Sequence, residues 1–240
     1  MKYSLFTFVF TIMSLCTWAQ TPCVDGMAGT YPCLNVDLMA FIPLEDIGDG
    51  DNTNDIWGWV SPVTGREYAL VGCSNGTAFL DISSPASPIY IGFLPTHTDE
   101  NLWRDLESDE RYCYIGSEAP DHGLQIFDLY QLDLVSNGPV EFEETAHFDA
   151  FGSSHTITLD PINHFVYCNG SRDLEGEFVY EGGLYIVDVS DPLNPTLAGG
   201  FAEDGYTHDS FLWNYDGPDA DYQGKQMVIA CNGGSLTFVD

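Results

Sequence analysis

Residues 182–201 read GGLYIVDVSDPLNPTLAGGF, and the fold prediction starts from this segment. It opens with a short apolar segment of strand character that ends at Asp188. Pro192 and Pro195 follow, and they predict a turn, because proline fixes φ and cannot continue a strand, while an aspartate before it can accept backbone N–H bonds. A second apolar segment comes after the turn. This stretch therefore predicts a strand, a turn and another strand.

The same pattern recurs along the chain, which is the signature of a repeat architecture. GTAFLDISSPASPIYIGFL (76–94) and GLQIFDLYQLDL (123–134) contain the apolar strand ending in aspartate, and GGSLTFVD (233–240) begins it again. The aspartates of the four strands lie 47, 60 and 52 residues apart: Asp81, Asp128, Asp188 and Asp240. Two further short strands are predicted upstream of each such strand and one downstream. Each unit is thus expected to contain four strands.

Four-stranded units of about 50 residues repeated around an axis are typical of a β-propeller. We therefore predict an all-β fold, a β-propeller of four-stranded blades, with about four blades in residues 35–240. NVDLMAFIPL (35–44) is expected to be a strand of the type that comes last in a unit, although it precedes the first unit. VEFEETAHF (140–148) is expected to be the last strand of the second unit. Because the fourth unit stops at Asp240, we expect an incomplete ring and a chain truncated at its C-terminus, so the total blade number stays open.

The N-terminal segment, residues 1–19, is predicted to be a signal peptide. It has a lysine, an apolar run from Leu5 to Leu15 and small residues before Gln20. Lipidation at Cys16 is the alternative, but the bulky Leu15 before it argues against lipidation. No later segment approaches the length of a transmembrane span. We expect an exported protein, either secreted or held at the cell surface.

The cysteines fall into two groups. Cys23 and Cys33 bracket the Gly- and Pro-bearing segment CVDGMAGTYPC, so residues 20–34 are predicted to be a disulfide-closed loop in an exported protein. The other cysteines beyond the signal peptide lie in or just after short apolar strands and are interpreted as small buried residues: Cys73, Cys113, Cys168 and Cys231.

The charge excludes one class of partner. The chain has 37 Asp and Glu residues against six Lys and Arg, a formal net charge of −31. Such a surface repels nucleic acid and anionic lipid, and it suits divalent cations or simple solubility. The partner is therefore expected to be an extracellular ligand or surface protein, whose identity the sequence does not give.

Aligning the units places four side chains at one equivalent position, 50, 50 and 53 residues apart: Asp55, Asp105, His155 and His208. Asn54 and Arg104 precede the two aspartates. Each pair stands where the first strand of its unit begins, and in a propeller the first strands line the central channel. We therefore expect Asn54, Asp55, Arg104, Asp105, His155 and His208 to converge as a ligand-binding site.

The chemistry of this set leaves several possibilities open. Asp55, Asp105, His155 and His208 are oxygen and nitrogen ligands that suit a divalent metal such as Ca²⁺ or Zn²⁺. Arg104 can instead hold an anion. A polar channel mouth that binds only water is the plain alternative. The acidic loop DIGDGDNTND (46–55) offers a second calcium candidate, although it does not fit the EF-hand template.

Several motifs in order resemble the choice-of-anchor B family, exported bacterial proteins with LVIVD-type repeats: CVDGMAGTYPC, NDIWGW, GREYALVGCSNGTAFLDIS, LWRD, GSSHTITLD, GGLYIVDVSDPLNP and DGYTHDS. The resemblance covers residues 23–240. It implies a secreted or surface-held β-propeller attached through differing C-terminal anchors, and it implies no known reaction. The departure is at the C-terminal end, where no anchor segment is visible.

Three functions remain compatible with the sequence. The leading hypothesis is a secreted or cell-surface binding module with its ligand at the channel mouth. The second is a metal-dependent hydrolase or lyase that uses the same residues, with His97 as a nearby base. The third is a purely structural surface protein. No catalytic motif is present, so catalysis stays open, and so does the oligomeric state.

Overall fold

The computed structural model describes residues 20–48 and 50–240, which divide into two compact units. The predicted signal peptide lies outside the described residues. Of the described residues, unit 1 contains 20–41 and Pro85–Ser87, and unit 2 contains 42–48, 50–84 and Pro88–Asp240.

Unit 1 contains a short hairpin closed by a disulfide. Strand β1 (Met27–Ala28) pairs with β2 (Tyr31–Pro32), and Cys23 and Cys33 are bonded with their Cα atoms 5.9 Å apart. The predicted disulfide is confirmed. The segment 35–44, expected to be a strand, is not one. Leu38 makes an isolated bridge with Thr21, and Asp37 accepts a bond from the backbone N–H of Cys23. Further along the segment, Ile42 and Leu44 belong to unit 2 and pack against a buried cluster of the first sheet.

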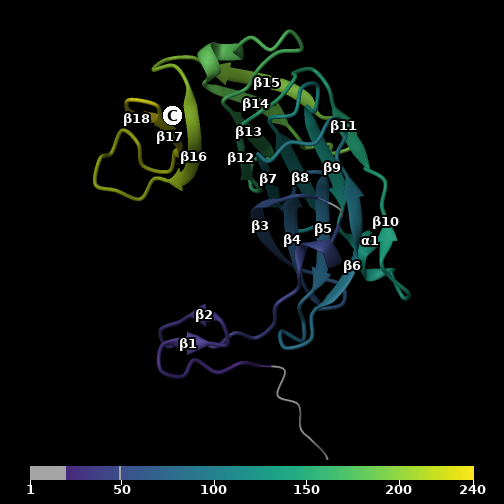
Figure 1. Ribbon diagram of the computed structural model, residues 1–240. Helices are drawn as coiled ribbons and strands as arrows, with labels where there is room; N and C mark the ends of the chain where they lie inside the picture. Colours follow the sequence, from purple (N-terminus) through teal and green to yellow (C-terminus); the bar gives the residue numbers. More distant parts are fainter. Residues whose placement is uncertain (1–19, 49) are drawn as a thin grey trace, which may run out of the picture. The chain divides into compact units, whose positions relative to one another are not determined.

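Unit 2 is all-β, as predicted, and its strands form four successive sheets (Figure 1). The first sheet contains β3 (Thr53–Val60), β4 (Glu67–Cys73), β5 (Gly76–Asp81) and β6 (Ile89–Pro95). The second contains β7 (Arg104–Ser108), β8 (Tyr112–Ser117), β9 (Leu124–Asp128) and β11 (Ala146–Phe148). The third contains β12 (Thr156–Asp160), β13 (Phe165–Asn169), β14 (Leu184–Asp188) and β15 (Thr196–Phe201). The fourth contains β16 (Thr207–Asn214), β17 (Gln226–Asn232) and β18 (Leu236–Val239).

Consecutive strands in these sheets pair antiparallel, and each of the sequence units corresponds to one sheet. Helical structure in the described residues is limited to η1 (Leu44–Asp46), α1 (Tyr130–Asp133) and η2 (Val179–Gly182). In the same part of the chain, no helix has the length and apolar character needed to cross a membrane.

The segment 140–148 differs from the prediction of one strand. Its first part, β10 (Val140–Glu141), pairs parallel with β6 in the first sheet, whereas β11 pairs antiparallel with β9 in the second. Gly92 permits this crossover, because a Cβ there would lie 2.2 Å from the carbonyl oxygen of Val140. Phe142, between the two strands, is buried against Phe79 and Phe127. The burial of this ring fixes the point at which the chain changes sheets.

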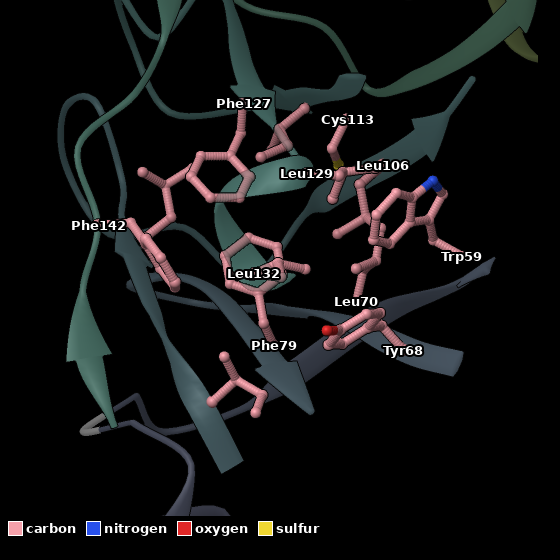
Figure 2. Close-up of a cluster of buried hydrophobic side chains, with 13 residues drawn as sticks. Trp59, Tyr68, Leu70, Phe79, Leu106, Cys113, Phe127, Leu129, Leu132 and Phe142 are labelled. Carbon is pink, nitrogen blue, oxygen red and sulfur yellow. The ribbon is translucent and has the colours of Figure 1, made fainter. Parts of the chain in front are cut away.

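The cores lie between neighbouring sheets. Between the first two, Phe79 of β5 stacks on Phe127 of β9 with ring centroids 4.8 Å apart (Figure 2). Trp59 of β3 lies in the same cluster, next to Tyr68. A second cluster joins the second and third sheets, and a smaller one joins the third and fourth. Apolar side chains therefore fill the space between consecutive sheets, and the polar residues of interest are left at the strand ends.

Candidate functional site

The first strands of the four sheets lie next to one another in chain order: β3 contacts β7, β7 contacts β12, and β12 contacts β16. Side chains on each strand bond to the backbone of the next. The carboxylate of Asp105 accepts from the N–H of Ile157 at 2.7 Å, and Thr158 Oγ1 donates to the carbonyl of Ser210 at 3.0 Å. The beginnings of these strands therefore form one continuous site region.

The predicted site residues lie in this region. Asn54 and Asp55 are in β3, Arg104 and Asp105 begin β7, His155 directly precedes β12, and His208 is the second residue of β16. His155 and His208 come together, with their Nε2 atoms 3.0 Å apart and ring centroids 4.4 Å apart. His155 is partly buried and His208 is exposed, so the pair is open to solvent.

Glu118 completes the histidine pair. It lies just after β8, and its Oε1 is 2.7 Å from Nδ1 of His155. A carboxylate on one imidazole nitrogen fixes the ring orientation and makes the other nitrogen more basic. Nε2 of His155 is therefore aimed at His208. Glu118 does not belong to the repeated position, so the alignment of the units gave no signal for it.

Asp55 and Asp105 accept hydrogen bonds that connect neighbouring sheets. Asp55 accepts from the N–H of Leu106 at 3.1 Å, and Asp105 bonds Ile157 as described. Burial, together with the charges of Asp55, Glu107 and Asp209, raises the pKa of Asp105 to about 8. Burial likewise raises the pKa of Glu107, whose carboxylate accepts from Leu159 N–H, to about 7. The charges of Asp55, Asp105, Glu107 and Asp209 therefore act on one another at the first strands, although Asp209 itself is exposed.

Arg104 is fully buried, and its guanidinium bonds Cys73, Thr96 and His122. Its Nε donates to the carbonyl of Cys73 at 2.9 Å, and Nη2 donates to Thr96 Oγ1 at 2.6 Å. Nη1 lies 3.0 Å from Nε2 of His122, which must accept, so the proton of His122 is on Nδ1, toward the carbonyl of Gly123. Burial and the charge of Arg104 lower the pKa of His122 to about 3. Asn54 donates to the Arg104 carbonyl at 3.0 Å.

Elsewhere in the described residues, three metal-ligating side chains have ligand atoms within 4.8 Å of one another. They are His97, Glu144 and His147. The four predicted ligands Asp55, Asp105, His155 and His208 are not such a set; instead, the carboxylates of Asp55 and Asp105 accept backbone N–H bonds. Asp49 of the acidic loop 46–55 lies outside the described residues.

Comparison with known proteins gives one family match and one structural likeness. The LVIVD repeat family matches residues 63–96, which include β4, β5 and β6, and residues 174–202, which include β14 and β15. The LVIVD-type repeat that the family resemblance implied is thus confirmed in two units. No curated protein matches the chain.

Among solved structures, the Pseudomonas aeruginosa periplasmic gluconolactonase PpgL is similar over 78% of this chain. The TM-score is 0.43 and the sequence identity is 12%. The chain covers 56% of the length of that protein.

Proposed function

We propose that this chain is part of an exported β-propeller, of the choice-of-anchor B type, that acts as a binding module at the cell surface or outside the cell. Its ligand site is the pair His155 and His208, supported by Glu118. The LVIVD repeats, the four successive antiparallel sheets and the adjacency of their first strands support the propeller proposal. The Cys23–Cys33 disulfide is consistent with an oxidising compartment.

The observation that carries the site proposal is the geometry of the two imidazoles. Their Nε2 atoms lie 3.0 Å apart and face each other across the boundary between the third and fourth sheets. Zn²⁺ binds histidine nitrogens at about 2.0–2.1 Å in a tetrahedral arrangement, which separates two such nitrogens by roughly 3.4 Å. A small movement of exposed His208 therefore makes room for an ion between them. Glu118 on Nδ1 of His155 is the usual outer partner of a metal-bound histidine.

The charge and the side chains around the histidine pair favour a bound cation that in turn binds a ligand. The net charge of −31 attracts divalent ions to the protein. Two imidazoles fill two positions of a four-coordinate ion, and the remaining positions are open to oxygen atoms of a ligand. Trp103 and Tyr206 flank His155, with ring centroids 5.9 and 6.3 Å from its own, and provide an aromatic border. The mechanism is presentation of the ion by rigid sheets, which lowers the ordering cost of binding.

The open coordination positions also support the second candidate, a metal-dependent hydrolase or lyase at the same pair. Turnover of an ester, phosphoester or glycoside by the zinc-loaded protein, lost in His208→Gln, would replace the binding proposal with the enzymatic one.

The test is zinc titration by calorimetry of the protein and of the His155→Gln and His208→Gln variants. His164→Asn is the matched control, because His164 is exposed, lies in a loop and has a positive φ of 61° that asparagine tolerates. We expect one zinc ion to be lost from each site variant and none from the control. A protein that binds no zinc, or site variants that bind it like the control, would contradict the proposal.

Export has its own measurement. Processing before Gln20 is expected to remove residues 1–19, which N-terminal sequencing of the protein recovered outside the cytoplasm would show. The mature chain would then begin with the disulfide-closed loop predicted at residues 20–34, and the repeat region predicted at 35–240 would follow, with its first sheet starting at Thr53. Retention of Met1 in the exported protein would contradict a cleaved signal peptide.

A further inference from the structure

Two histidines that the site does not use, His97 and His147, lie at another edge, where the first and second sheets meet. His97 follows β6, His147 is in β11, and Glu144 stands between β10 and β11. We propose that His97, Glu144 and His147 form a second transition-metal site, of the two-histidine, one-carboxylate class, separate from the pair His155 and His208.

The three side chains are already in contact. Nδ1 of His97 lies 2.9 and 3.1 Å from the two oxygens of Glu144. The rings of His97 and His147 stack with centroids 3.5 Å apart and an interplanar angle of 13°. One ligand atom from each residue lies within 4.8 Å of the others, which is close enough for one ion to reach all three. Two nitrogens and one carboxylate oxygen suit Zn²⁺.

His147 is prepared for coordination by a backbone group. Its Nε2 lies 2.6 Å from the carbonyl oxygen of His122. A carbonyl oxygen only accepts hydrogen bonds, so Nε2 carries the proton of the neutral ring and the lone pair is on Nδ1. A carbonyl partner on the far nitrogen is a common outer-shell arrangement of metal-bound histidines. His122 is in turn held by the buried Arg104, so the orientation of His147 rests on a fixed network.

The three residues are accessible to an ion from solvent, and binding would have a structural consequence. His97 and Glu144 are partly exposed, with 33% and 27% of their side chains accessible, so an ion can enter from solvent. An ion at Nδ1 of His97 takes the place of the proton shared with Glu144, and that proton moves to Nε2 of the same ring. The stacked rings must then splay to direct both lone pairs at the ion. Binding would tie the loop after β6 to the segment that crosses from β10 to β11.

The test is zinc stoichiometry and affinity in the His155→Gln/His208→Gln double variant, which removes the site of the proposed function and leaves this one. Glu144→Gln and His147→Gln are added to that background one at a time. Glu143→Gln is the matched control, because Glu143 is the exposed neighbour of Glu144 and carries the same charge.

We expect the double variant and its Glu143→Gln derivative to bind one zinc ion. Glu144→Gln and His147→Gln should weaken that binding by at least about tenfold, given that even loss of an outer partner costs this much. A thermal shift on zinc addition that disappears in the same two variants would show that the folded protein is being measured. Absence of zinc from the double variant, or equal affinity of Glu144→Gln and Glu143→Gln, would overturn the proposal.

Discussion

The carboxylate of Asp105 accepts a 2.7 Å hydrogen bond from the backbone N–H of Ile157, across the boundary between the second and third sheets. Glu107 makes the equivalent bond to Leu159, and Asp55 makes one from the first sheet to Leu106. Partly buried carboxylates thus join the first strands at successive boundaries. Because these strands are adjacent, the acids are buried near one another, and burial, together with the neighbouring negative charges, raises the pKa of Asp105.

Asp105 makes stability fall with rising pH. Its pKa is raised to about 8 in the folded protein, above the usual value of 3.8, so the folded state keeps a proton that the unfolded state loses. The contribution of Asp105 to the free energy of unfolding is therefore largest below about pH 4 and is lost as the pH rises to about 8. The asparagine in Asp105→Asn does not titrate. The free energy of unfolding of this variant should therefore rise relative to that of wild type by at least about 1 kcal/mol from pH 5 to pH 8.

Urea denaturation at pH 5, 6.5 and 8 with EDTA present measures this difference. Asp216→Asn, at an exposed aspartate, is the control and should leave the pH slope unchanged. Parallel pH profiles for Asp105→Asn and wild type would show that Asp105 is charged throughout.

Arg104→Lys should destabilise the fold strongly. The guanidinium is fully buried and bonds Cys73, Thr96 and His122 at once. A lysine ammonium cannot copy this planar arrangement, and the loss of two bonds to a charged group costs at least about 3 kcal/mol.

The matched control for Arg104→Lys is Arg111→Lys. The Arg111 side chain is 49% exposed and pairs with Asp128 at the surface. Arg111→Lys should therefore lower the free energy of unfolding by less than about 1 kcal/mol. Chemical denaturation of both variants measures the two costs. Similar costs would mean that Arg104 is not held in the interior.

Phe79→Ala tests the core between the first two sheets. Phe79 is fully buried, stacks on Phe127 and meets Phe142 edge-on with centroids 5.5 Å apart. Removing the ring should cost about 3–5 kcal/mol. Phe211→Ala, at a ring that is 63% exposed, should stay within about 1 kcal/mol in the same denaturation experiment. A tolerated Phe79→Ala would contradict the packing of β5 on β9.

Much of the sheet structure follows from local pattern. The apolar strands that end in Asp81, Asp128 and Asp188 are β5, β9 and β14, because a short apolar run followed by a proline or aspartate turn has few alternatives. The spacing of the units likewise predicts strand starts near residues 104 and 155, where β7 and β12 begin. Repetition carries this information, since equivalent residues occupy equivalent places.

The remaining features depend on tertiary context. Segment 140–148 contributes to two sheets because a glycine 48 residues upstream, Gly92, lets the backbone approach, which no local pattern reveals. Segment 35–44 is apolar enough for a strand, yet Leu38 bridges to Thr21 and Ile42 and Leu44 pack on the first sheet, so it pairs with no strand. Glu118, Glu144 and His147 lie outside the repeated position, so only folding brings them to His155 and His97.

The central claim is that adjacent first strands bring His155 and His208 together as a metal-binding pair. Anomalous diffraction at the zinc absorption edge, from crystals of the exported protein grown with zinc, tests this claim most directly. We expect a peak within bonding distance of Nε2 of both residues. A map with no peak at either Nε2, or with the two imidazoles directed apart, would contradict it.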